Sequence, residues 1–172
     1  MQNKKRQGIE SMLDLKGRTV LVVDDEVVNL DYLVAILSNG VDIAVAMDGP
    51  TALAMAYENP PDLILLDVLM PGMDGFEVCR RLLADERTRD IPVVFVTVVT
   101  DIQEIVRGLE LGAIDYITKP FEPTIVRARV RNYLSRKLAL DRVREQNAAL
   151  HEAAAYRADM ERITRHDLKG PL

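Results

Sequence analysis

Three acidic side chains follow predicted strands at positions where they could share one metal ion. Asp24 and Asp25 come directly after the apolar run 19–23, and Asp67 ends the run 63–67. Because the carboxyl ends of parallel strands meet at one edge of a sheet, we expect these carboxylates to lie together. Carboxylates at such short range repel one another, and one takes up a proton unless a cation compensates them. Oxygen ligands with open coordination positions suit Mg²⁺, so the sequence predicts a magnesium site.

Two further side chains at the same predicted edge could act on a phosphoryl group. Thr97 ends the fourth apolar run, and Lys119 lies just past the fifth. A metal and a lysine ammonium can offset the charge of a phosphoryl group in transfer, and a hydroxyl can donate to one of its oxygens. Asp67 is then the predicted nucleophile, which accepts phosphate as an acyl phosphate. Any one of these residues alone is more often structural, for example as a helix cap, so the prediction depends on the constellation.

A repeated strand and helix pattern between Arg18 and Pro120 would position these side chains. Several apolar runs are nearly continuous in Val, Ile and Leu, as in parallel strands that are covered on both faces. Such repeats predict an α/β fold with a doubly wound, five-stranded parallel sheet and right-handed crossovers. The predicted strands are 19–23, 42–46, 63–67, 93–97 and 116–118, and the predicted helices are 27–38, 50–58, 75–84 and 102–111.

The composition indicates one compact domain plus an extension. The chain has 172 residues, of which 48% are hydrophobic, and its longest apolar runs are too short for a membrane-spanning helix. Residues 1–17 are polar, have no apolar signal core and are predicted to be disordered or loosely ordered. Cys79 is the single cysteine, which agrees with a reducing compartment. We therefore expect a cytoplasmic protein without membrane contact.

Four sequence motifs resemble the receiver domain of the response regulators of two-component signalling. The motifs are VLVVDDE, LILLDVLMPGMDG, VVFVT and GAIDYITKPF, in the family's order and at similar spacing, and the resemblance covers about residues 18–135. It implies a flavodoxin-like fold that accepts phosphate from a histidine kinase. By this resemblance Asp24, Asp25 and Asp67 hold Mg²⁺ with the backbone carbonyl of Leu69, and Asp67 is the phospho-acceptor.

The same resemblance implies a switch at the end of the sheet. Thr97 and Lys119 match the family's hydroxyl and lysine, and Tyr116 matches its switch aromatic. Phosphoryl oxygens would draw Thr97 inward, and Tyr116 would rotate into the vacated space and alter the nearby surface. The alternative for Tyr116 is a half-buried aromatic at the sheet edge. The peptide bond between Lys119 and Pro120 is expected to be cis.

Three positions depart from the family's pattern. Val98 stands where the family usually has a small residue beside the phosphorylation pocket. Leu69 and Val99 stand where polar side chains often place the hydrolytic water, and neither side chain can form hydrogen bonds. We hypothesise that access to the pocket is restricted and that the aspartyl phosphate is long-lived.

The segment after Pro123 predicts one long helix, because it has no glycine before Gly170 and no proline before Pro171. Its heptad pattern predicts a parallel two-stranded coiled coil over 136–165, and therefore a homodimer. Polar interruptions at Arg136 and Arg157 leave open an amphipathic helix that folds back on its own receiver. The heptad positions are Val126, Tyr133, Leu140, Asn147 and Ala154, with Val143 and Leu150 at the complementary positions.

The last ten residues, ITRHDLKGPL, resemble the H-box that begins the dimerisation helix of histidine kinases. By this match His166 is a phospho-acceptor histidine, and Asp167 is its neighbouring acid or base. Gly170 departs from the Thr or Asn that often precedes the proline. The alternative is an ordinary surface histidine, which is our interpretation of His151. If the H-box match is correct, residues 166–172 begin a truncated kinase dimerisation helix.

These observations predict phosphorelay signalling. Asp67 would accept phosphate from a histidine kinase and switch a surface that controls a C-terminal output, expected to be the kinase core of a hybrid histidine kinase. The sequence contains no ATP-binding motif, so this segment is not expected to phosphorylate itself from ATP. The alternatives are a stand-alone dimeric regulator that docks other proteins, or a receiver of another output enzyme. No helix-turn-helix pattern follows the receiver, so we expect no nucleic-acid partner.

Overall fold

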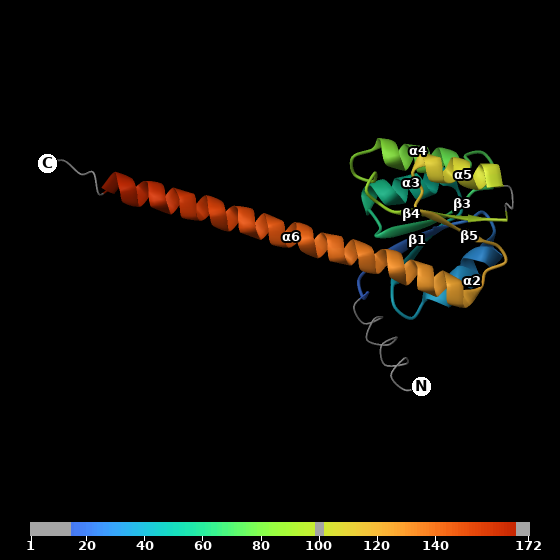
Figure 1. Cartoon of the computed structure of the whole chain (residues 1–172). Coiled ribbons are helices and arrows are strands. Elements are labelled where there is room, and N and C mark those ends of the chain that lie inside the picture. The colour runs from blue at the N-terminus through green and yellow to red at the C-terminus, as the bar shows by residue number, and fades with distance from the viewer. Residues whose placement is uncertain (1–14, 99–101, 168–172) are drawn as a thin grey trace, which may run out of the picture. The chain divides into compact units, whose positions relative to one another are not determined.

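One parallel sheet forms the centre of the first unit of the molecule. The computed structural model describes residues 15–98 and 102–167, without the side chain of Asp167, and the chain divides into two compact units, Met1–Ser135 and Arg136–Leu172. The sheet has the strand order β2-β1-β3-β4-β5, and each neighbouring pair is parallel (Figure 1). The predicted doubly wound α/β fold is confirmed. The strands are β1 (Thr19–Val23), β2 (Asp42–Ala46), β3 (Leu63–Asp67), β4 (Val93–Thr97) and β5 (Asp115–Thr118).

Helices cover both faces of this sheet, as Figure 1 shows. Side chains of alternate strand residues point to opposite faces. Leu21, Ile64 and Leu66 therefore pack in one apolar cluster with α3 (Gly49–Glu58) and α4 (Gly75–Ala84). Val20, Leu63 and Leu65 pack in the other with α2 (Val27–Leu37) and the first turns of α6 (Pro123–Asp167). The remaining helix among the described residues of this unit is α5 (Ile102–Leu111), which lies on the same face as α3 and α4.

The boundaries of the elements agree closely with the predicted ones. β5 begins one residue earlier than predicted, at Asp115. Ser38 is the C-cap of α2, because its N–H donates to the carbonyl of Val34. Asp48 caps α3 and accepts a hydrogen bond from the N–H of Thr51 at 2.7 Å, which lowers the pKa of its carboxyl. The local capping groups thus fix helix ends that periodicity alone leaves open by a residue.

The core of the first unit begins earlier in the chain than the sequence suggests. Leu15 is 3% exposed and packs in the cluster beneath α2 and α6. Arg18 forms an ion pair with Asp62 at 2.8 Å, and this pair lies between the start of β1 and the start of β3. Residues 1–14 of the predicted lead-in lie outside the described residues. The described part of the lead-in, 15–17, contributes to the fold.

The predicted long C-terminal helix is confirmed as α6, of 45 residues. Val126, Val130 and Leu134 are at most 3% exposed and pack in the core of the first unit. Tyr133 is half-buried beside them, and its hydroxyl donates to Asp115 at 2.8 Å. The prediction that Val126 and Tyr133 belong to a coiled-coil seam is therefore wrong. Their seven-residue spacing arises because this part of the helix packs on the sheet.

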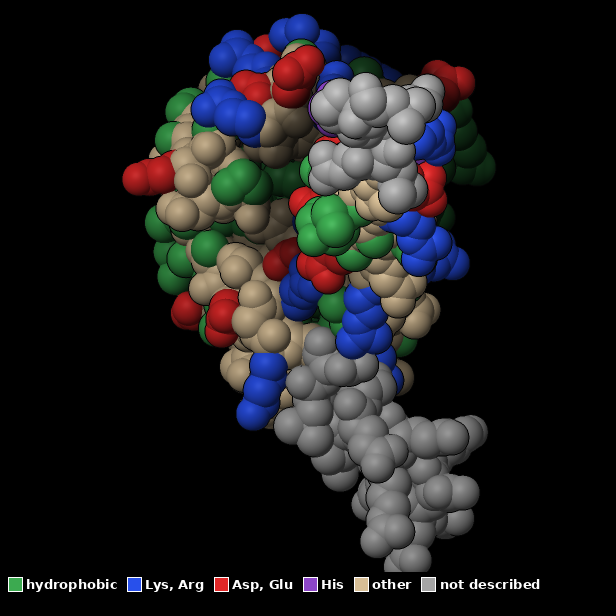
Figure 2. Space-filling model, turned by 90° about the vertical axis from the view of Figure 1, so that its left-hand side faces the viewer, with side chains coloured by type: hydrophobic (Ala, Val, Ile, Leu, Met, Phe, Trp, Pro, Cys, Tyr) green, Lys and Arg blue, Asp and Glu red, His purple; other side chains and the backbone are tan. Residues whose placement is uncertain are grey.

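The surface shows no dominant charge on the face drawn in Figure 2, where Lys and Arg side chains lie among Asp and Glu side chains. Within the described ranges, none of the helices is both long enough and apolar enough to cross a membrane.

Candidate functional site

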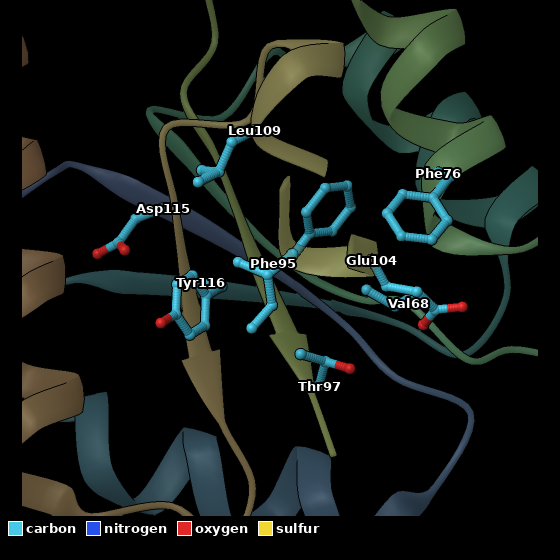
Figure 3. A pocket seen from close by; sticks show the side chains of 9 residues that line it. Val68, Phe76, Phe95, Thr97, Glu104, Leu109, Asp115 and Tyr116 are labelled. Atoms are coloured by element: carbon cyan, nitrogen blue, oxygen red, sulfur yellow. The ribbon is translucent and has the colours of Figure 1, made fainter. Parts of the chain in front are cut away.

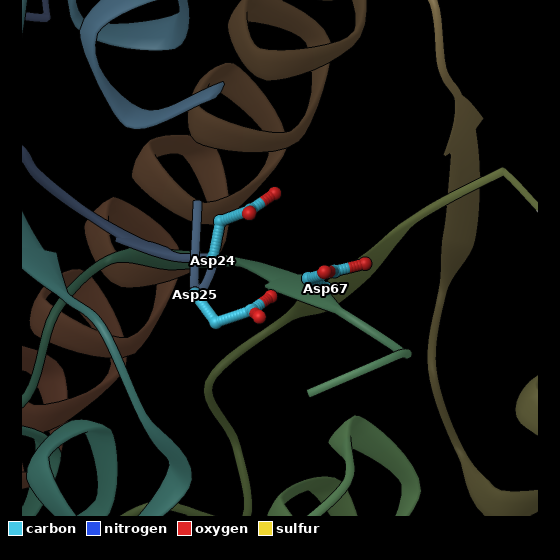
Figure 4. A group of neighbouring side chains, drawn as sticks. All are labelled: Asp24, Asp25 and Asp67. Atoms are coloured by element: carbon cyan, nitrogen blue, oxygen red, sulfur yellow. The ribbon is translucent and has the colours of Figure 1, made fainter. Parts of the chain in front are cut away.

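Three carboxylates meet at the carboxyl edge of the sheet, as the sequence predicts. Asp24 and Asp25 follow β1, Asp67 ends β3, and each offers an oxygen within 4.8 Å of the others (Figure 4). Asp24 is 1% exposed and Asp67 is 3% exposed, whereas Asp25 is half-buried. Burial of two carboxylates at such short range is costly unless positive charge compensates them.

Asp24 is held by the first turn of α2. Its Oδ1 accepts hydrogen bonds from the backbone N–H of Glu26 at 2.9 Å and from Nδ2 of Asn29 at 3.1 Å. Sequence reasoning missed Asn29, although its place in the helix that directly follows the acidic pair was a usable signal. These two donors fix the orientation of the carboxylate, whose other oxygen, Oδ2, lies 2.7 Å from Nζ of Lys119.

The start of α4 packs directly against the end of β3. A Cβ atom at Gly75 would collide with the backbone carbonyl of Asp67, and the Gly75 N–H donates to the carbonyl of Val68 at 2.9 Å. Asp74 caps the helix by accepting a hydrogen bond from the N–H of Glu77 at 2.8 Å. Only glycine permits this close approach. The contact fixes the backbone from which the Asp67 side chain projects.

Lys119 supplies the positive charge next to the acidic cluster. Its Nζ lies 2.7 Å from Oδ2 of Asp24 and 3.3 Å from Oδ2 of Asp67. Its backbone N–H donates to the carbonyl of Thr97 at 2.9 Å, and the Lys119–Pro120 bond is cis, as expected. Burial lowers the pKa of Lys119, but the contact with Asp24 and the charges of Asp67 and Asp24 outweigh burial and raise it. The lysine is therefore a permanent cation in this site.

The carboxyl of Asp67 is unusually basic in the absence of a metal. Burial raises its pKa from 3.8 to about 6, and the neighbouring charge of Asp24 acts in the same direction. The charge of Lys119 and hydrogen bonds from Lys119 and from the backbone of Leu69 oppose this rise. One cation thus does not fully compensate the cluster, and a second cation would be bound favourably.

The raised pKa predicts that Asp67→Asn stabilises the metal-free protein at neutral pH. The folded state binds the Asp67 proton more tightly than the unfolded chain, so stability from this group is present below pH 4 and is lost as pH rises through 6. A change from 3.8 to about 6 corresponds to an upper limit of roughly 3 kcal/mol above pH 7. Urea unfolding in EDTA should show this gain at pH 7.5 and none near pH 4, with exposed Asp31→Asn as the control. Equal stabilities of wild type and variant at pH 7.5 would contradict the electrostatic account.

The cluster fits a magnesium ion. Oδ2 of Asp24 is buried and accepts no hydrogen bond of acceptable geometry from the described residues, although Lys119 lies close to it. Three carboxylate oxygens lie together at the carboxyl edge of the sheet, where Asp25 is only half-buried. Such a site suits a hard cation that keeps several waters. Leu69, whose carbonyl is the fourth predicted ligand, lies two residues past Asp67 with its side chain 55% exposed. Its role as a ligand stays a prediction.

Thr97 and Tyr116 are brought together as predicted. Both line a small pocket between β4, β5 and α5, where Figure 3 shows them on adjacent strands. Thr97 is 3% exposed and Tyr116 is half-buried. Sequence reasoning missed Glu104, which lines the same pocket from the first turn of α5. The other lining residues are Val68, Phe76, Phe95, Ile105, Leu109 and Asp115.

Two of the positions that depart from the family pattern, Leu69 and Val98, follow the strand ends that carry Asp67 and Thr97. Val98 follows Thr97 at the end of β4 and is 57% exposed. The exposed side chains of Val98 and Leu69 place apolar groups at the sheet edge and offer no hydrogen-bonding group. Val99 lies outside the described residues.

The second unit contains the predicted phospho-acceptor histidine. His166 lies in the last turn of α6 and is exposed. Asp167 is the last residue of the helix, and residues 168–172 of the H-box resemblance lie outside the described residues. The helix thus includes the histidine, and the assignment of a kinase role stays a prediction.

Comparisons with known proteins agree with this geometry. The model of the response regulator receiver domain family matches residues 20–131. Response regulator PleD of Caulobacter vibrioides is 49% identical over 131 residues, which are 76% of this chain and 29% of PleD. The DNA-binding response regulator MtrA of Mycobacterium tuberculosis is 46% identical over 125 residues, 72% of this chain and 54% of MtrA. The chain thus spans about half or less of these relatives' lengths.

A solved structure shows the same fold. The signal receiver domain of a signal transduction histidine kinase from Syntrophus aciditrophicus is 37% identical. The alignment covers 69% of this chain and 91% of that one, with a TM-score of 0.64.

Proposed function

Because the chain belongs to the response regulator receiver domain family, we propose that its Asp67 accepts a phosphoryl group from a histidine kinase in a magnesium-dependent reaction. Receiver domains of this family take phosphate from histidine kinases. The observation that carries the proposal is the position of Lys119, whose Nζ lies between the buried carboxylates of Asp24 and Asp67. A structural ion pair needs one carboxylate, whereas this site has two and a third, Asp25, beside them.

The chemistry follows from these positions. An oxygen of Asp67 attacks the phosphorus of the donor's phosphohistidine, the new O–P bond forms as the P–N bond breaks, and the leaving imidazole takes up a proton. Mg²⁺ held by Asp24, Asp25 and Asp67 would offset the negative charge of the phosphoryl oxygens. The ammonium group of Lys119 would offset the same negative charge, and the hydroxyl of Thr97 could donate to one phosphoryl oxygen.

A small phosphodonor tests this function. We expect intact-mass spectrometry to find one phosphoryl group on the wild-type chain after incubation with acetyl phosphate and Mg²⁺. The adduct should be absent with EDTA and absent from Asp67→Asn, while Asp31→Asn, the matched loss of an exposed charge on α2, should behave as wild type. A phosphoryl group on Asp67→Asn would contradict the assignment of the acceptor.

The pocket shared by Thr97 and Tyr116 supports a switch. Attraction of Thr97 toward the phosphoryl group would vacate space that adjoins the Tyr116 ring, and α5 with β5 forms the surface beside it. The variant Tyr116→Ala lacks the ring, and we expect it to keep the fold. Asp67 should still be phosphorylated in this variant, but phosphorylation should no longer affect the output.

The lifetime of the phosphoryl group is proposed to be long. Leu69 and Val99 have side chains that cannot form hydrogen bonds, so neither could place a water for hydrolysis. Loss of the phosphoryl group within seconds of donor removal would contradict this proposal.

The proposed output is a histidine kinase core that follows α6, with the protein in the cytoplasm. Support comes from the sequence around His166 and from a receiver of similar fold that belongs to a histidine kinase. α6 would form a parallel homodimer through residues 136–165. The alternatives are a stand-alone regulator that docks proteins and a receiver of another output enzyme. DNA binding is named for MtrA, and a nucleic-acid partner is not part of our proposal.

A further inference from the structure

The second unit carries a row of exposed apolar side chains that changes its phase. Leu138 is half-buried, whereas six other large apolar side chains of α6 beyond Ser135 are between 47% and 70% exposed. They are Leu140, Val143, Leu150, Tyr156, Met160 and Ile163. Their spacing alternates between three and four residues, with Asn147 between Val143 and Leu150, up to Leu150. From Asn147 onward the next positions are Leu150, Ala153 and Tyr156, which are three consecutive steps of three.

A continuous heptad does not account for the second half of this row. If the pattern of Leu140, Val143 and Leu150 continued unchanged, its next positions would be Ala154, Arg157, Glu161 and Thr164. The large apolar side chains Tyr156, Met160 and Ile163 each lie one residue earlier. One residue on an α-helix is a rotation of about 100°. The helix therefore has a proximal seam (Leu140, Val143, Asn147, Leu150) and a distal seam (Ala153, Tyr156, Met160, Ile163) on different faces.

The two seams are joined by one residue fewer than a continuous heptad requires, because Ala153 follows Leu150 after three residues instead of four. We call this phase shift the skip. The shortened pattern overwinds a coiled coil locally, as two insertions of three residues would, and this overwinding turns both seams toward the partner helix. It also explains the polar interruption at Arg157. A continuous heptad would bury this guanidinium in the seam, which is costly, whereas the skip moves it to a flanking position.

The charges at the skip favour a second copy of the same chain as the partner. At the start of the distal seam, Glu152 directly precedes Ala153, and Arg157 directly follows Tyr156. In a parallel pair these flanking positions of opposite helices meet, so Glu152 of one copy faces Arg157 of the other. Asn147 lies in the proximal seam, where an asparagine pairs with its equivalent and fixes the register.

We infer that a second copy covers α6 along the proximal seam up to Leu150 and along the distal seam from Ala153 onward. The inference rests on the proposed parallel homodimer and adds the phase shift within it. The skip divides the helix pair into two segments that can rotate relative to each other. His166 lies on the distal segment, so this is the point where a signal can change the presentation of the helix end.

The rate of disulfide formation between two copies of the full chain distinguishes the shifted pattern from a continuous heptad. The native Cys79 does not interfere, because it is buried and burial raises the pKa of its thiol to about 11. Under mild oxidation we expect Val143→Cys and Ile163→Cys to form cross-linked dimers. Ile163→Cys should react at least about tenfold faster than Thr164→Cys, because only seam positions bring two sulfurs within bonding distance. Ala153→Cys should likewise react faster than Ala154→Cys, a matched pair of exposed alanines.

Each outcome decides between named alternatives. Faster reaction at Thr164 and Ala154 would overturn the skip in favour of a continuous heptad. Reaction at Val143 with none at the distal positions would also overturn the skip while the homodimer stands. No reaction at any position would refute the homodimer itself, and phosphorylation of Asp67 would be unaffected by that result.

A charge exchange provides an independent test. Glu152→Arg should slow cross-linking through Ile163→Cys, because two arginines would then face each other. Adding Arg157→Glu should restore the rate. Equal rates in the single and double variants would contradict the assigned flanking positions.

Discussion

Lys119→Gln is expected to lower the rate of Asp67 phosphorylation by about 10²- to 10³-fold, the usual cost of removing one fixed group that stabilises transition-state charge. Lys119 Nζ lies 2.7 Å from Asp24 and 3.3 Å from Asp67, so its charge acts directly on both carboxylates. The rate should be measured by intact-mass spectrometry over time with acetyl phosphate at saturating Mg²⁺. Glutamine keeps the length of the side chain but removes the charge.

The same variant should bind Mg²⁺ as tightly as wild type or more tightly. Loss of a positive charge beside three carboxylates increases their attraction for another cation. Slow phosphorylation combined with undiminished Mg²⁺ affinity would separate a role in the reaction from a general loss of structure. Lys16→Gln, which removes an exposed lysine, is the control. A Lys119→Gln variant that is phosphorylated at the wild-type rate would refute the role of the lysine.

Asp25→Asn is expected to weaken Mg²⁺ binding at least tenfold, because even groups that only support metal ligands typically contribute about 10- to 100-fold to affinity. Asp25 is the half-buried member of the cluster, and its replacement leaves the hydrogen bonds that hold Asp24 in place. Calorimetric titration with MgCl₂ measures the affinity directly. Phosphorylation should recover when the Mg²⁺ concentration is raised in proportion.

Asp31→Asn supplies the control for this loss of charge, because Asp31 is exposed on α2. Its Mg²⁺ affinity should equal that of wild type. If both variants weakened binding equally, the effect would be one of net charge, and the three-carboxylate site would be wrong.

The sheet and the acidic cluster could be predicted from the sequence because their signals are local. Nearly continuous apolar runs indicate buried parallel strands, and the residue that ends each run is fixed at one edge of the sheet. The grouping of four site residues could therefore be predicted without knowledge of how the helices pack. These residues are Asp24, Asp25, Asp67 and Lys119.

The misassigned residues depend on packing between distant segments. Val126 and Tyr133 fit a heptad, but a helix that packs on a sheet has the same periodicity as one that packs on another helix. Leu15 follows a polar stretch, and only the space between α2 and α6 makes it part of the core. Asn29 and Glu104 are ordinary helix residues in sequence, and their roles depend on which side chains the fold brings near them.

The central claim is that phosphate is accepted on Asp67, and chemical mapping of the phosphorylated chain tests it most directly. Borohydride reduces an acyl phosphate of aspartate to homoserine, which marks the residue permanently. After phosphorylation, reduction and digestion, mass spectrometry is predicted to find homoserine at position 67 and aspartate at positions 24 and 25. Homoserine at either of those positions, or a phosphoryl group recovered only on a histidine, would contradict the account.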